Sequence, residues 1–148
     1  MNKILGAASA AAAAAACIAV GTAGTASADP ELNGTYAVTL DGTQATTTGF
    51  AAQNPQVRTE NWVITSCGAG CAHVSIPDKP AIANSGDLHL NNGRWEMTQE
   101  YSLMHCGSGP DITLFTSFDA VSLQGTQDNT NHCVGDNKIT TPITLAPA

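Results

Sequence analysis

The sequence predicts an all-β fold, an antiparallel meander of about eight strands that closes into a small barrel, with a β-sandwich as the alternative. Beyond the first 28 residues, no window shows a sustained apolar period of 3.6 residues, which argues against amphipathic helices. Short alternating runs instead follow one another every 8–12 residues or so, separated by Gly, Asn, Asp and Pro. We favour the barrel because consecutive hairpins give up-and-down order and closure removes unpaired sheet edges.

The stretch 62–76 has the strongest hairpin pattern in the chain. Its central Gly-Ala-Gly predicts a three-residue loop between two strands. Folding the chain back about this loop pairs Cys67 with Cys71 and Thr65 with His73 on a mainly polar face. The opposite face then carries mainly apolar side chains, and a slip of one residue would mix the two faces. The pattern therefore fixes the register of the pair.

A second hairpin is predicted over residues 86–101. Asn92-Gly93 is the pair of residues preferred in a type I′ turn. Folding about that turn pairs His89 with Glu96 on a polar face. The other face would contribute four apolar side chains to the core: Leu88, Leu90, Trp95 and Met97.

Weaker alternation predicts the remaining strands, over residues 32–40, 45–51, 112–118, 121–125 and 139–145. Pro142 lies inside the last run and has no N–H for a ladder, so we expect an edge strand or a bulge there. Residues 127–137 are polar and rich in turn formers. We expect them to form a long loop that Cys133 ties down.

The N-terminus has the pattern of a secretory signal peptide, which we expect to be helical. Lys3 supplies a positive charge, an Ala-rich apolar run follows, and Ala26-Ser27-Ala28 provides the small residues that precede a cleavage site. The apolar run is interrupted by glycine and has no basic flank after it, so we expect no membrane span after cleavage.

Cleavage after Ala28 would divide the chain into a signal peptide, residues 1–28, and a single disulfide-stabilised β domain, residues 29–148. The mature protein would then be secreted, extracellular or held in the cell envelope. Cys17 leaves lipidation open as an alternative. The three residues before Cys17 are alanine, however, without the bulky aliphatic side chain that lipoprotein signals usually have three positions before the cysteine.

The charge balance excludes some partners. The chain carries five Lys and Arg residues against twelve Asp and Glu, a formal net charge of −7 at pH 7. Removal of the leader takes away Lys3 and leaves −8. An acidic domain with so few cations is a poor match for nucleic acid.

Four cysteines remain after the leader, an even number that predicts two disulfides in an exported chain. Three pairings are possible. The hairpin register favours Cys67–Cys71, which leaves Cys106–Cys133. A zinc site made from the four thiols is the alternative, but Cys-x3-Cys is not the usual Cys-x2-Cys knuckle.

Several short motifs are spread along the chain: the Ala-Ser-Ala end of the leader, Gly34-Thr35-Tyr36, Trp62, Ser66-Cys67, Cys71, Gly93-x-Trp95, Cys106 and Leu123-x-Gly125-Thr126. Together they resemble a family of small exported mycobacterial proteins of unknown function. Similar modules form extracellular parts of some mycobacterial serine/threonine kinases. The general layout is also similar to a lipocalin-type barrel, by analogy of fold alone. The resemblance implies no activity and no cofactor.

Two histidines are the candidate chemical groups. His105 precedes Cys106 and His132 precedes Cys133, so a bridge between the cysteines would bring both imidazoles onto neighbouring backbone. A metal would need a third ligand, from Asp111, Asp128 or Asp136. The alternative is that both are surface histidines beside a structural disulfide. Ser108 lacks the Gly-x-Ser-x-Gly pattern of a hydrolase nucleophile.

The predicted function is that of a secreted, non-enzymatic binding or interaction module. An extracellular hydrolase or metal-binding protein that uses His105 and His132 is the alternative. The partner would be an apolar small molecule or an envelope or extracellular protein. Six inward side chains would line such a ligand or fill the barrel: Tyr36, Trp62, Leu88, Trp95, Met97 and Phe118.

Overall fold

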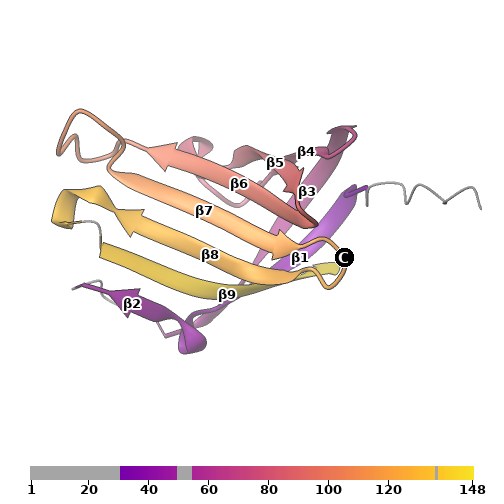
Figure 1. Cartoon of the computed structure of the whole chain (residues 1–148), viewed down its shortest axis with the longest axis horizontal. Helices are drawn as coiled ribbons and strands as arrows, with labels where there is room; N and C mark the ends of the chain where they lie inside the picture. The colour runs from indigo at the N-terminus through magenta and orange to yellow at the C-terminus, as the bar shows by residue number, and fades with distance from the viewer. Residues whose placement is uncertain (1–30, 50–54, 136) are drawn as a thin grey trace, which may run out of the picture.

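One antiparallel sheet of nine strands curls until its first strand meets its last (Figure 1). The computed structural model describes residues 31–49, 55–135 and 137–148. The strands are β1 (Gly34–Asp41), β2 (Thr46–Thr48), β3 (Val57–Gly68), β4 (Cys71–Ser75), β5 (Ser85–Asn91), β6 (Arg94–Tyr101), β7 (Ile112–Asp119), β8 (Gln124–Asn131) and β9 (Asn137–Pro147). Three 3₁₀ turns complete these elements: η1 (Gly42–Gln44), η2 (Ala81–Ala83) and η3 (His132–Val134).

The sheet closes between β1 and β9, which makes an eight-stranded barrel with β2 as an extra strand. The order is β1-β3-β4-β5-β6-β7-β8-β9, and β1 pairs with β9 from Tyr36–Pro147 to Leu40–Ile143. The short β2 pairs with the other half of β9, from Thr46–Thr140 onward. The all-β, antiparallel, closed-barrel prediction is confirmed, and the sandwich alternative is wrong.

Pro142 does not lie on a sheet edge, because β9 pairs with β8 from Asn137 to Thr144, including Thr126–Pro142. On its other side, β9 changes partner. The β2 pairing ends at Thr140 and the β1 pairing begins at Ile143. Pro142 thus lies in the gap between two partner strands, where no N–H is needed for the ladder.

The first predicted hairpin is confirmed, with one local difference. Thr65 pairs with His73 and Ile64 with Val74, as expected. The register then shifts between Ser66 and Gly68, so that Gly68 and not Cys67 is opposite Cys71. This bulge shortens the loop by one residue, and the left-handed φ of 67° at Gly70 closes it.

The second hairpin also has the predicted turn. Asn92 and Gly93 both have positive φ, 50° and 78°, as a type I′ turn requires. His89–Glu96 and Leu90–Trp95 pair across it, but the ladder extends no further. Beyond that point Gln99 bridges the two strands, because its Nε2 donates to the carbonyl oxygen of Ser85 at 2.7 Å.

The predicted loop over residues 127–137 is wrong, since most of it belongs to β8 and the start of β9. β8 pairs with β7 on one side and β9 on the other over its full length. Its backbone groups are therefore satisfied by two ladders although its side chains lack apolar alternation.

The apolar core fills one part of the barrel interior. Its buried members come from every strand of the barrel except β8. Leu32, Leu90, Ala120 and Leu123 pack against them at one end of the barrel. That end holds the two predicted hairpin turns and both ends of the described chain. The central side chains, Trp62, Trp95 and Phe118, are at most 1% exposed. The six side chains expected to line or fill the interior all lie in this core: Tyr36, Trp62, Leu88, Trp95, Met97 and Phe118.

The predicted signal-peptide helix, its cleavage site and Cys17 lie outside the described residues, as does part of the strand expected over residues 45–51. In the part of the chain that the structure describes, no helix has the length and apolar character needed to span a membrane.

Gly125 provides a test of this packing. A Cβ there would lie 2.0 Å from the carbonyl oxygen of Ser117 and 2.5 Å from Cα of Phe118. Both are backbone atoms of β7, which cannot move away without disturbing the ladder. We expect Gly125→Ala to lower the free energy of unfolding by about 2–3 kcal/mol, as overpacking does. Urea titration measures the loss.

Gly107→Ala is the matched control, because a Cβ at Gly107 meets nothing within 4 Å. Its effect should stay within about 0.5 kcal/mol. Equal midpoints for the two variants would contradict the close approach of β7 and β8.

Candidate functional site

The two disulfides have the predicted pairing and lie at opposite ends of the barrel. Cys67–Cys71 crosses the β3–β4 turn, and Cys106–Cys133 ties the β6–β7 connection to η3. The second bridge places His105 and His132 near one end of the barrel, where sequence analysis expected a possible metal or catalytic site.

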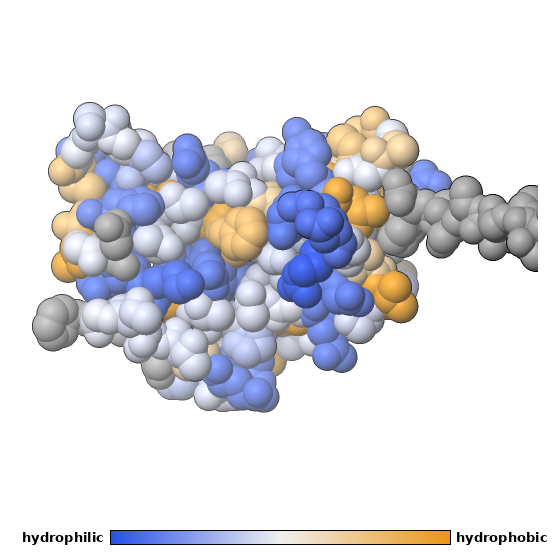
Figure 2. Space-filling model, in the orientation of Figure 1, coloured by the Kyte–Doolittle hydropathy of each residue, from blue (hydrophilic) through white to orange (hydrophobic). Residues whose placement is uncertain are grey.

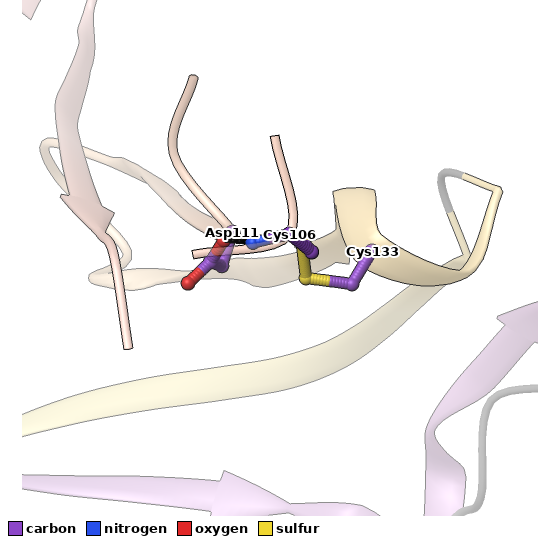
Figure 3. A group of neighbouring side chains, drawn as sticks. All are labelled: Cys106, Asp111 and Cys133. Atoms are coloured by element: carbon purple, nitrogen blue, oxygen red, sulfur yellow. Dashed lines mark hydrogen bonds between the residues drawn. A yellow bond between two sulfur atoms is a disulfide. The ribbon is translucent and has the colours of Figure 1, made fainter. Parts of the chain in front are cut away.

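Asp111 organises the connection beside this disulfide (Figure 3). Its side chain is buried, and its carboxylate accepts hydrogen bonds from three consecutive backbone N–H groups, those of Met104, His105 and Cys106. His105 has a left-handed φ of 53°, which turns the three N–H groups toward one point. Such a nest of N–H groups is a common way to hold an anion, and here the anion is part of the chain.

These contacts make Asp111 a structural carboxylate. The hydrogen bonds, that of Met104 foremost, hold its pKa below the ordinary value of 3.8 although burial acts in the opposite direction. Cys106, Asp111 and Cys133 are the one group of three potential metal-ligating side chains among the described residues. Both sulfur atoms are joined to each other, so this group is not a metal site.

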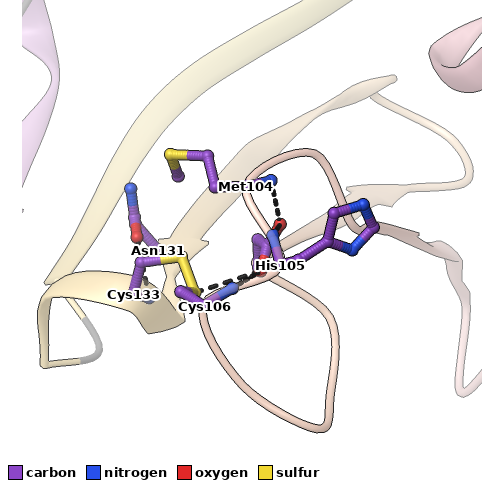
Figure 4. The surroundings of a disulfide bond; sticks show 6 residues. Met104, His105, Cys106, Asn131 and Cys133 are labelled. Carbon is purple, nitrogen blue, oxygen red and sulfur yellow. Dashed lines mark hydrogen bonds between the residues drawn. A yellow bond between two sulfur atoms is a disulfide. The ribbon is translucent and has the colours of Figure 1, made fainter.

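The two histidines are not gathered with a third ligand within the described residues. His105 points away from the disulfide (Figure 4), and His132 Nε2 lies 2.9 Å from the hydroxyl oxygen of Thr113. Asp128 lies 2.9 Å from the ammonium group of Lys138, and Asp136 is outside the described residues. An open hollow of about 270 Å³ beside the disulfide is lined by Cys106, Gly107, Gly109, Pro110 and His132.

A second candidate site lies in the barrel interior, at the end that carries the Cys106–Cys133 disulfide. Strand register places Arg58 and Glu60 of β3 on the inward side, opposite the inward Leu40 and Val38 of β1. Across the barrel, Gln127 and Asn129 of β8 take inward positions, because their partners on β7 are Thr116 and Leu114. We call this half of the interior the polar end, defined by Arg58, Glu60, Gln127, Asn129 and Thr141.

The polar end contains a cavity of about 110 Å³. It is lined by Gly42, Ala45, Arg58, Gln127, Asn129, Ile139 and Thr141. These residues belong to β3, β8, β9 and the connection between β1 and β2, so the cavity lies where β9 changes its partner strand. A guanidinium group, two amides and a hydroxyl offer both donors and acceptors to a ligand.

Glu60 anchors the other side of the polar end. Its Oε1 lies 2.6 Å from Lys79 Nζ, and its Oε2 accepts a hydrogen bond of 3.5 Å from the indole Nε1 of Trp62. Trp62 lies in the apolar core, so this contact marks the boundary between the two halves of the interior.

Tyr101, at the end of β6, contributes a buried hydroxyl within electrostatic range of Glu60. It is 6% exposed, and its hydroxyl has no hydrogen-bonding partner among the described residues. Burial, and next the negative charge of Glu60, raise the pKa of Tyr101 above its ordinary value of 10.0, so the phenol is neutral near pH 7. A buried hydroxyl without a protein partner is a place where water or a ligand binds.

The outer wall has its own hollow, an open groove of about 530 Å³ lined by Gly86, Asp87, His89, Glu96, Thr98 and Phe115. It lies along β5, β6 and β7. Figure 2 shows that the visible outer surface is largely hydrophilic or neutral, with a pale hydrophobic area near its middle. His73 Nδ1 lies 2.6 Å from Asp87 Oδ1 on the neighbouring strands β4 and β5, an ordinary cross-strand contact.

The polar end was not predicted from the sequence. Inward residues were predicted from the alternation of apolar side chains, and β8, with the sequence Gln-Gly-Thr-Gln-Asp-Asn-Thr-Asn, has no such alternation. One available signal was Arg58, a basic residue four positions before Trp62 in a chain with few cations. The partners of Arg58 across the barrel depend on register, which the sequence of β8 alone does not determine.

Comparisons with known proteins agree with the fold. The solved structure of the monomer form of the M. tuberculosis PknI sensor domain matches with a TM-score of 0.60 and 16% sequence identity, over 79% of this chain and 87% of that chain. The similarity to modules of mycobacterial serine/threonine kinases, expected from the motifs, is thus confirmed at the level of the fold. No protein-family model and no curated protein matches the chain.

The role of Asp111 can be tested through pH. Because its pKa is lowered on folding, its carboxylate adds stability above the pKa of the unfolded chain, and this stability is lost as pH falls through the folded pKa. Asp111→Asn should therefore unfold at lower urea concentration than the wild type at pH 7, with a gap that narrows below about pH 4.

Asp78→Asn, on the exposed β4–β5 connection, is the control for loss of one negative charge. Its urea midpoint at pH 7 should match that of the wild type. If Asp111→Asn behaves like Asp78→Asn at pH 7, Asp111 does not hold the connection in place.

Proposed function

We propose that this protein is an exported binding module that takes up a small polar ligand at the polar end of its barrel. The observation that carries the proposal is the cavity of about 110 Å³ whose lining presents Arg58, Gln127, Asn129 and Thr141. Polar side chains that converge on a cavity in an otherwise apolar barrel provide orientation and specificity for a ligand.

The division of the interior supports a polar ligand over an apolar one. The six side chains that would have lined an apolar site pack against one another in the core. Space and hydrogen-bonding groups instead occur together at the polar end. Binding, rather than catalysis, also agrees with a fold similar to that of a sensor domain.

Export supports the same proposal. The leader predicted over residues 1–28 and the two disulfides both agree with a protein that works outside the cytoplasm. There the barrel would meet small molecules of the envelope or the medium directly.

The export step predicts a defined product. Protein recovered from the culture medium or envelope of an actinobacterial host should begin at Asp29, with a mass four hydrogens below that of the reduced chain. Intact-mass spectrometry measures both features. A chain that still begins at Met1, or one modified by lipid at Cys17, would contradict the proposed processing.

The binding site predicts where ligands act. We would titrate ¹⁵N-labelled mature protein with glycerol, glucose and glycerate in turn. Backbone amide signals of Gly42, Ala45 and Asn129 should move, because these residues line the cavity. The signal of Val121, on the turn at the opposite end, serves as the internal control. Shifts confined to the residues around Cys106–Cys133, or the absence of any shift with all three compounds, would overturn the proposal.

A further inference from the structure

We infer that the ligand of the polar end carries a carboxylate, and that Arg58 is its counterion. This inference rests on the proposed function and specifies the class of ligand. The argument begins with the basic side chains, because a chain with a net charge of −7 has few with which to bind an acid.

Four Lys and Arg residues lie in the described part of the chain, and three of them have partners. Lys79 is paired with Glu60 at 2.6 Å and Lys138 with Asp128 at 2.9 Å. Arg94 donates two hydrogen bonds, to the hydroxyl and the carbonyl oxygen of Ser117, at 2.9 and 3.0 Å.

Arg58 differs from these three residues. Among residues 31–49, 55–135 and 137–148, no acceptor binds its guanidinium group, although it lines the cavity. A guanidinium group presents paired N–H donors in a planar arrangement that matches the two oxygens of a carboxylate. Its position therefore favours an acid over a neutral ligand.

The nearby carboxylates do not cancel this charge. Glu60, two residues along β3, is neutralised by Lys79. Asp41, at the end of β1, is turned toward η1, where it accepts hydrogen bonds from Thr43 and Gln44. Hydrogen bonds, that of the Thr43 side chain foremost, lower the pKa of Asp41 and keep it ionised in that role.

The neutral groups of the lining suit hydroxyls next to the carboxylate. Gln127 Nε2 donates to Thr116 Oγ1 at 3.3 Å, which leaves the amide oxygen of Gln127 to accept from a ligand. Within the described residues, the side chains of Asn129 and Thr141 have no hydrogen-bonding partner.

The volume sets the size of the bound group. A cavity of 150 Å³ is known to hold benzene, so one of about 110 Å³ holds a group of roughly four to six non-hydrogen atoms. Glycerate has seven non-hydrogen atoms, so its carboxylate and the adjacent carbon with its hydroxyl would occupy the cavity and its hydroxymethyl group would lie at the opening. The carboxylate end of a larger sugar acid would also fit if the rest of the molecule projected into solvent.

Isothermal titration of the mature protein tests the inference with glycerate, glucuronate and the neutral glycerol. We expect glycerate or glucuronate to bind at least about tenfold more tightly than glycerol, the usual effect of one charge-assisted contact. Preference for glycerate indicates a small free acid, and preference for glucuronate indicates the acid end of a larger molecule.

Arg58→Gln should lose about tenfold or more in affinity for the preferred acid, and Arg58→Lys should recover part of it. Lys138→Gln removes the same charge from an outward position on β9, and its affinity should stay within about twofold of the wild type. Amide NMR spectra of each variant establish that it is folded.

Three results would overturn the inference. If glycerol and the acids bind equally, the carboxylate assignment is wrong and the proposed function stands. If Arg58→Gln binds the acids as the wild type does, Arg58 is not the counterion, and the amide shifts of Gly42, Ala45 and Asn129 decide whether the acid binds at the polar end. If none of the three compounds binds the wild type, the carboxylate assignment and the proposed function are both wrong.

Discussion

Closure of the sheet along β9 is the constraint on which the rest of the structure depends. One edge of β9 is shared by two strands, β1 over residues 143–147 and β2 over residues 138–140. The chain between those strands must leave β9 and return, which it does through η1. The cavity is lined by Gly42 and Ala45 on one side of this gap and Thr141 on the other. Closure thus produces both the continuous apolar core and, within the described residues, the interruption beside which the cavity lies.

The interior is divided because apolar side chains are stabilised by leaving water, whereas charged and polar side chains are stabilised by keeping contact with it. At the hairpin end, apolar side chains pack closely, and each large one contributes about 1.5–3 kcal/mol by leaving water. At the polar end, Arg58 and the amides of β8 keep access to solvent, so their desolvation cost stays low. The ion pair of Glu60 with Lys79 lies between these two regions. The buried apolar side chains therefore lie mainly at one end of the barrel, and the cavity lies at the other.

The sequence predicted those parts of the fold in which local chemistry and burial agree. Asn92-Gly93 defines its turn, and alternation around Trp62 and Trp95 indicates which faces are buried, so both hairpins follow from local pattern. β8 escaped prediction because its order comes from two neighbouring ladders and not from its own side chains. The polar end was not predicted for the same reason, since only closure of the barrel brings Arg58 and Asn129 to the same cavity. The histidines were singled out from the sequence only because each precedes a bridged cysteine. In the structure, the backbone N–H groups of both donate hydrogen bonds to Asp111, that of His105 to the carboxylate and that of His132 to the carbonyl oxygen.

If the interior is divided as described, solvent enters the polar end and is kept out of the apolar core. A crystal structure of the mature protein at high resolution, grown without organic acids, tests this division directly through ordered water. Water molecules should bind Arg58, Asn129 and the hydroxyl of Tyr101, and, apart from one at the unpartnered indole Nε1 of Trp95, none should lie among Trp62, Trp95 and Phe118. Water or unexplained density between the two tryptophans, with Arg58 folded into an ion pair with a neighbouring carboxylate, would contradict the account. The ligand would then have to be sought in an apolar cavity.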